Sequence, residues 1–165
     1  MITIINGSIE AALNDDNIVI AHIVNSQGGW GAGVSGVITK MCINAERMYR
    51  GWFSTKKHVM DLYLPEFKLG NVQFVLGDDN RKIFYANMLA QNGYMSETNK
   101  HPLNLDALGK ALIKLCEFAK SRGLIIHMPK IGSGLGGGNW DQVYELVDNI
   151  TDSYGLKVVI YDYQQ

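Results

Sequence analysis

Two glycine-rich stretches supply the residue types from which an anion site can be built. The first, 25–33, reads Asn-Ser-Gln-Gly-Gly-Trp-Gly-Ala-Gly, and the second holds five glycines between Gly132 and Gly138. Glycine contributes no apolar area and costs backbone entropy, so packing does not explain such stretches. Each follows an apolar run and precedes a segment with helical periodicity. Bare backbone at a helix start brings N–H groups close to an anion, and the pair therefore predicts a phosphate-binding cleft.

Other phosphate and catalytic motifs are absent or misplaced. Residues 31–36 match G-x-G-x-x-G, but six residues separate them from the preceding apolar run, whereas a dinucleotide-binding turn follows its strand directly. The sequence contains no G-x-x-x-x-G-K-[ST], and no G-x-S-x-G surrounds Ser133. The four histidines form no metal-binding motif, so we expect no metal site and no cofactor. A dinucleotide fold and plain tight turns remain the alternatives for the glycines.

Composition describes one ordinary globular domain over residues 1–165. Hydrophobic residues make up 47% and charged residues 19%, and the net charge of −1 gives no general attraction to nucleic acid. Cys42 and Cys116 lie in helical apolar patterns and are predicted to be buried free thiols. The N-terminus has no basic region typical of a signal peptide, and no apolar run is long enough for a membrane span. We expect a cytoplasmic monomer that binds neither membrane nor nucleic acid.

Alternating strand and helix patterns must position the two glycine-rich stretches. Apolar, β-branched runs predict strands at 2–5, 18–24, 72–76, 82–88, 124–128 and 157–161. Apolar residues three and four apart predict a short helix after Ser8, a helix over 34–52 that Asn44 or Gly51 breaks or ends, and helices over 104–122 and 140–150. Residues 77–80 read as a hairpin turn, and 90–102 form a loop long enough to be a lid.

This alternation predicts an α/β fold of three layers, with helices on both faces of a mixed sheet. The run 18–24 is apolar on both parities, as in a central strand that is buried on both faces. Ligands of such sheets lie beyond the carboxyl ends of the strands. If the strands 18–24 and 124–128 are neighbours, the two glycine-rich stretches face each other and could hold a diphosphate without a lysine or a metal.

At these stretches the sequence resembles the macrodomain family, which binds ADP-ribose. The resemblance covers nearly the whole chain and depends on residues 21–33 and 128–140. Met-Pro-Lys-Ile-Gly, followed by glycines and Asn-Trp, is similar to the branch that contains the terminal ADP-ribose glycohydrolase and the ADP-ribose-1″-phosphate phosphatase. Gly-Gly-Trp-Gly at 28–31 is closer to the phosphatase members. The resemblance implies a three-layer macrodomain with a mixed sheet and a cleft for ADP-ribose.

The resemblance also implies which residues would contact the ligand. The second glycine-rich stretch would hold the diphosphate, the first would surround the distal ribose, and the adenine would lie near residues 9 and 161–163. The expected ligand-binding residues are Ser8, Ile9, Gly28, Trp30, Gly31, Ala32, Gly33, Ile131, Gly132, Ser133, Gly134, Leu135, Gly136 and Tyr161.

Two departures from the family pattern bear on function. Ser8 stands where many members have an aspartate that accepts from the adenine amino group, and a helix N-cap explains Ser8 equally well. Gln91 and Gly136 stand near the positions of the lysine and aspartate of the glycohydrolase type. Without the amine nucleophile and its carboxylate partner, the Schiff-base route is not expected.

Three functions stay open. Hydrolysis of ADP-ribose-1″-phosphate needs stabilised phosphoryl charge and an oriented water, which His22 or Asn25 would orient or deprotonate. For His22, a core histidine is the alternative. A module that binds ADP-ribose without turnover is the second function, and a hydrolase removing ADP-ribose from protein or nucleic acid is the third. The sequence 28–31 and the missing lysine and aspartate favour the phosphatase.

Overall fold

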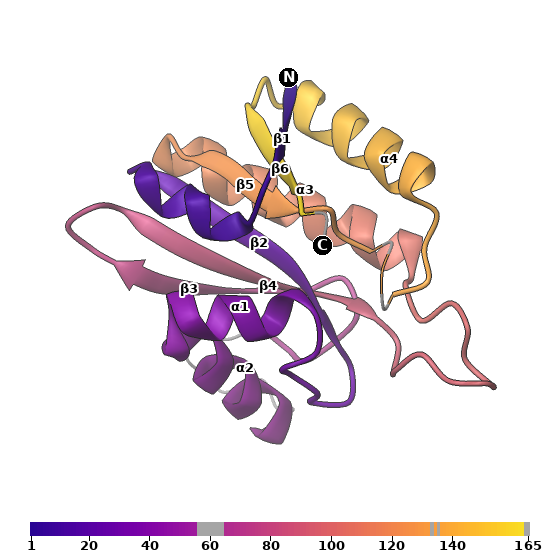
Figure 1. Cartoon of the computed structure of the whole chain (residues 1–165). Helices are drawn as coiled ribbons and strands as arrows, with labels where there is room; N and C mark the ends of the chain where they lie inside the picture. The colour runs from indigo at the N-terminus through magenta and orange to yellow at the C-terminus, as the bar shows by residue number, and fades with distance from the viewer. Residues whose placement is uncertain (56–64, 133, 135, 164–165) are drawn as a thin grey trace.

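The computed structural model describes residues 1–55, 65–132, 134 and 136–163 of the chain. In these ranges six strands form one sheet in the spatial order β1-β6-β5-β2-β4-β3 (Figure 1). The strands are β1 (Ile2–Asn6), β2 (Ile18–Asn25), β3 (Val72–Asp78), β4 (Ile83–Gln91), β5 (Ile125–Pro129) and β6 (Val158–Asp162). Neighbouring strands are parallel, except for the antiparallel hairpin of β3 and β4. The prediction of a mixed sheet with one inserted hairpin is confirmed.

Helices cover both faces of this sheet, which confirms the three layers. They are the 3-10 helix η1 (Ile9–Asn14) and the α-helices α1 (Val34–Met41), α2 (Ile43–Thr55), α3 (Leu105–Arg122) and α4 (Trp140–Ser153). Helices α3 and α4 pack on one face, while η1, α1 and α2 pack on the other (Figure 1). No helix in the described ranges is both long enough and apolar enough to cross a lipid bilayer.

Helix α3 shows why the sequence pattern predicts these elements well. The Asn104 side chain accepts from the Ala107 N–H at the N-terminus, and Gly123 ends the helix in the left-handed conformation with φ 66°. Between these caps the buried residues recur at spacings of three and four and form the core face of the helix: Ala107, Leu108, Ala111, Leu112, Leu115, Cys116 and Ala119. Cys116 is thus a buried free thiol, as predicted.

Several boundaries differ from the prediction. The helix expected over 34–52 divides at Cys42, whose backbone is extended, and Gly51 lies inside α2. Helix α1 packs in one apolar cluster with Ala45 of α2, whereas Tyr49 and Trp52 of α2 lie in a second cluster, and Cys42 between the helices is half-buried. Strand β3 continues through a bulge after Leu76, which moves the hairpin turn beyond Asp78. Strand β4 ends at Gln91, so the following loop spans 92–104.

The central strand positions the functional edge. Strand β2 pairs in parallel with β5 on one side and with β4 on the other. Its residues from Ile18 to His22 have almost no exposed surface, as the apolar pattern predicts. Since β2 and β5 are neighbours, the two glycine-rich stretches leave the same edge of the sheet side by side.

Candidate functional site

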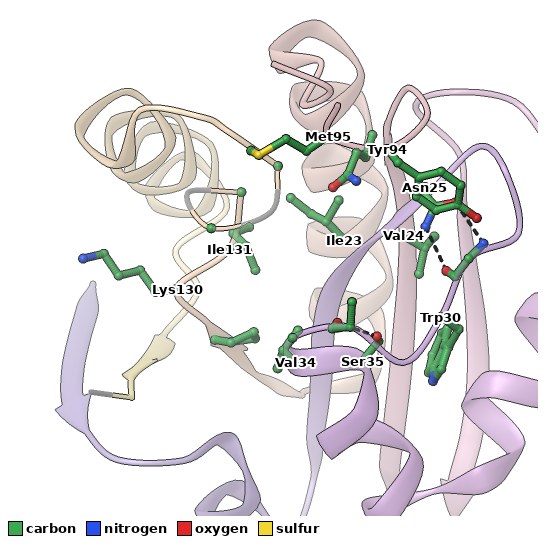
Figure 2. A pocket seen from close by; sticks show the side chains of 18 residues that line it. Ile23, Val24, Asn25, Trp30, Val34, Ser35, Tyr94, Met95, Lys130 and Ile131 are labelled. Atoms are coloured by element: carbon green, nitrogen blue, oxygen red, sulfur yellow. Dashed lines mark hydrogen bonds between the residues drawn. The ribbon is translucent and has the colours of Figure 1, made fainter. Parts of the chain in front are cut away.

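The two glycine-rich stretches line one cleft of about 650 Å³ at the carboxyl edge of the sheet (Figure 2). This volume is typical of sites for nucleotide-sized ligands. The cleft wall includes the predicted residues Asn25, Trp30, Ala32, Gly33, Ile131, Gly132, Gly134 and Gly136. The prediction that both stretches face one cleft is confirmed. The predicted contacts Ser133 and Leu135 lie outside the described residues.

The first glycine-rich stretch ends in a helix whose N-terminus is open toward the cleft. Gly33 is the N-cap of α1 and makes no side-chain capping bond, while Val34 and Ser35 of the first turn line the cleft. The first N–H groups of a helix have no partner within the helix and carry its positive dipole end. The Ser35 hydroxyl accepts from the Gly31 N–H at 2.8 Å and donates to the Ala32 carbonyl at 2.8 Å, so it braces the loop.

The second glycine-rich stretch is folded by bonds that occupy its carbonyl groups. The Gly132 oxygen accepts from the Gly138 N–H at 2.8 Å, and the Gly134 oxygen accepts from the Gly137 N–H at 3.0 Å. The Gly136 oxygen accepts from the Leu103 N–H at 3.1 Å. These contacts hold the loop closely folded at the cleft wall. Backbone N–H groups from both sides of the cleft can therefore bind a phosphate.

Charged side chains contribute little to the cleft. Lys130 is the one charged residue among the described lining residues. Its ammonium lies 3.9 Å from a carboxylate oxygen of Asp162 and 5.3 Å from the Trp140 ring centre, and Figure 2 shows it pointing away from the other labelled side chains. Across the described ranges, no group of three or more His, Cys, Asp or Glu side chains could hold a metal ion. An anion here would be stabilised mainly by backbone dipoles.

Asn25 organises the first glycine-rich stretch with its side chain. Its Oδ1 accepts from the N–H groups of Gln27 at 2.9 Å and Gly29 at 3.1 Å, and its Nδ2 donates to the Gly29 oxygen at 2.8 Å. An amide that is occupied in this way cannot act as a base. What remains for Asn25 at the cleft is one N–H of its Nδ2, so it can donate to a ligand and cannot deprotonate water.

His22 is not on the cleft wall. Its ring is fully buried and packs edge-on against Trp30 at 5.0 Å between ring centres. Nε2 lies 2.6 Å from Oδ1 of Asn87, whose Nδ2 donates to the Ala45 carbonyl. Because Oδ1 can only accept, Nε2 carries the proton, and Nδ1 has no hydrogen-bond partner among the described residues. Strand alternation directs His22 toward α1 and α2, and its position matches the core-histidine alternative.

Three predicted contacts near the adenine end lie off the cleft wall. The Ser8 hydroxyl caps η1 and accepts from the Glu10 N–H at 3.2 Å, as the N-cap alternative predicts. Ile9 and Tyr161 are buried together in the cluster under η1 and α1. The Tyr161 hydroxyl lies 2.9 Å from Nδ1 of His127, inside the protein. Packing thus engages these three side chains away from the cleft, and their ligand contacts stay predictions.

Two glycines of the first stretch serve the loop itself. A Cβ on Gly28 would overlap the Phe53 ring, so glycine permits the loop to pack on α2. Gly31, with φ 112°, gives its N–H to Ser35. Neither glycine is among the described residues that line the cleft.

The wall also includes Gln91, Tyr94 and Met95, which the sequence did not mark as contacts. Gln91 ends β4 in register with Asn25 on β2, and a Cβ on Gly136 would lie 3.4 Å from its Oε1. The two positions that the resemblance matches to the catalytic lysine and aspartate are therefore neighbours. Gln91 could have been predicted as a lining residue, because it stands at the end of a strand that reaches the same edge of the sheet.

The loop 92–104 contacts both glycine-rich stretches. The Gly93 N–H donates to the Ser26 hydroxyl at 2.9 Å, and His101 Nδ1 lies 2.9 Å from the Gly137 oxygen. Tyr94 lies near Asn25 in Figure 2, whereas the Met95 side chain extends toward the second glycine-rich stretch, and both residues are nearly half exposed. The loop thus forms a rim of the cleft between the two stretches.

Several known proteins resemble the chain over most of its length. No family model matches the chain. A solved structure of a protein of unknown function from Bacteroides thetaiotaomicron is 32% identical, with a TM-score of 0.86, and 98% of each chain is covered. A macrodomain protein from Streptomyces coelicolor is 30% identical, with a TM-score of 0.80, covering 99% of this chain and 100% of that one. The ADP-ribose 1″-phosphate phosphatase of Lodderomyces elongisporus is 26% identical over 156 residues, covering 88% of each chain.

Proposed function

The chain belongs to the macrodomain family, and we therefore propose that its cleft binds ADP-ribose or a close derivative. One observation carries the proposal. Two glycine-rich stretches and the uncapped N-terminus of α1 meet across a single cleft of about 650 Å³. Such an arrangement suits a diphosphate, because backbone N–H groups from both sides can share its charge.

The remaining parts of the ligand would extend from the diphosphate in opposite directions. The distal ribose would lie at the end lined by Asn25, Gln91 and Tyr94, whose amides and phenol suit hydroxyl groups. The adenine would lie toward the ends of β1 and β6. The Ser8 hydroxyl is already engaged in capping η1, so we expect it to contribute little to recognition of the base.

Calorimetric titration with ADP-ribose tests the binding function. We expect a roughly micromolar dissociation constant, and an affinity for AMP that is at least about 10-fold lower, because AMP lacks the second phosphate and the distal ribose. ADP-ribose added in excess should also raise the melting temperature of the protein. If ADP-ribose gives neither binding heat nor a thermal shift, the proposed function is wrong.

Hydrolysis of ADP-ribose-1″-phosphate is the second candidate, and the curated relative from Lodderomyces elongisporus favours it. The described cleft wall contains no carboxylate and no histidine, so no described lining side chain can act as an ordinary general base. Catalysis would then depend on orienting water and on stabilising phosphoryl charge with backbone N–H groups and the free Asn25 N–H.

Release of inorganic phosphate from ADP-ribose-1″-phosphate tests this second candidate. We expect the wild-type protein to produce phosphate and ADP-ribose in equal amounts, and the Asn25→Ala variant to do so about 100-fold more slowly, as when one charge-stabilising donor is removed. Binding of the substrate without release would contradict the phosphatase and favour a module that reads ADP-ribose. Release of ADP-ribose from a modified protein or nucleic acid would instead favour the third hypothesis.

A further inference from the structure

Helix α2 holds Asn25 through one buried phenol. Tyr49 has no exposed surface, and its hydroxyl lies 2.5 Å from the backbone oxygen of Asn25 and 3.2 Å from Oδ1. The Tyr49 ring also packs on Trp30, 5.4 Å between ring centres. Within the described part of the chain, no other side chain hydrogen-bonds to Asn25. Tyr49 is therefore the link between this helix and the cleft residue.

These contacts fix which face of the Asn25 amide a ligand meets. Oδ1 is surrounded by two backbone N–H groups and the phenol, while one hydrogen of Nδ2 is bound to the Gly29 oxygen. A flipped amide would direct its NH₂ group at two N–H donors, which is unfavourable. Burial raises the pKa of Tyr49 far above its usual value, so the phenol keeps its proton and stays a donor.

We propose that Tyr49 is a positioning residue that holds Asn25 with one amide N–H, and no lone pair, facing the cleft. This inference rests on the proposed function, since it concerns the same cleft. The ligand group recognised at this point is a hydrogen-bond acceptor, which a ribose oxygen or a phosphoryl oxygen provides. Tyr49, within the second turn of α2, thereby sets the chemistry of the cleft wall without touching the ligand.

A double-mutant cycle on ADP-ribose affinity tests the proposal. Tyr49→Phe removes one hydroxyl and keeps the ring, and we expect it to weaken binding about 10-fold in the wild-type background. In the Asn25→Ala background the same change should weaken binding less than about 2-fold, because the side-chain amide that Tyr49 positions is gone. A similar loss in both backgrounds, or no loss in either, overturns the proposal. The matched control is Tyr85→Phe, since Tyr85 is also buried but lies at the opposite end of the sheet. We expect this variant to bind ADP-ribose with the affinity of the wild type.

The side-chain amide signals of Asn25 in the ligand-free protein provide a second measurement. In the wild type, the two amide protons should be well separated and the one bound to Gly29 should exchange slowly with water. Tyr49→Phe should move both signals and speed this exchange, whereas Tyr85→Phe should not. Unchanged Asn25 signals in Tyr49→Phe contradict the proposal. If wild-type protein fails to bind ADP-ribose, the proposed function fails, and these signals alone decide whether Tyr49 positions Asn25.

Discussion

Replacement of Gly134 by glutamate is expected to lower the affinity for ADP-ribose at least about 100-fold. Gly134 is exposed and lines the cleft, and a Cβ added there would meet no atom within 4 Å. The first atom of the new side chain therefore meets no steric obstacle outside the adjacent residues. Its carboxylate adds a negative charge where the proposed site holds a diphosphate. Two like charges about 4 Å apart repel by roughly 4 kcal/mol at an effective dielectric constant near 20, and solvent and salt reduce this value.

The matched control is Gly51→Glu, which makes the same change of charge on α2. A Cβ on Gly51 also meets no atom within 4 Å, and Gly51 is exposed and does not line the cleft. Calorimetry should give wild-type affinity for this control and no measurable binding for Gly134→Glu under the same conditions. Wild-type affinity in Gly134→Glu would show that the diphosphate does not lie between the glycine-rich stretches.

The order of the elements and the two walls of the cleft follow from local sequence. A buried parallel strand needs an apolar run on both faces, and residues 18–24 have one. A helix that packs on a sheet needs apolar residues three and four apart, as α3 has. Glycines that cluster directly after two such strands then lie at one edge, because parallel strands that are neighbours end together. Each step uses only residues close together in the chain.

The partners of individual side chains did not follow from local sequence. Ser8 has a hydroxyl suited to either a base or a helix end, and only the folded chain shows that it accepts from Glu10. Tyr161 is the next-to-last residue of β6, which ends at the carboxyl edge of the sheet, but strand alternation turns its ring toward η1 and His127. Tyr49 reaches Asn25 from a helix 24 positions further along the chain. Such contacts depend on the angle at which a helix crosses the sheet.

The burial of His22 also did not follow from local sequence, and it predicts that the protein becomes less stable at acid pH. Burial lowers its pKa from 6.5 to about 4, with the hydrogen bond to Asn87 opposing the shift. Below pH 6.5 the unfolded chain therefore binds a proton that the folded chain refuses, so the free energy of unfolding falls as the pH falls. The loss begins near pH 6.5, levels off below about pH 4 and amounts to roughly 3 kcal/mol in total.

Urea unfolding of wild type and His22→Gln at pH 7 and pH 4.5 measures this loss. Burial also lowers the pKa of His127, and carboxylates titrate in both proteins, so the difference between their losses isolates His22. We expect the wild type to lose about 2 kcal/mol more than His22→Gln over this range. The matched control His101→Gln removes an exposed imidazole and should behave as the wild type does.

If His22→Gln does not fold, the NMR titration of the His22 ring in the wild type decides, because a midpoint near 6.5 would contradict its burial beneath Trp30. A midpoint near 4 would also make His22 a weak base at neutral pH, and its buried ring is not among the described residues that line the cleft, so the same titration tests whether the chemistry must come from the cleft wall.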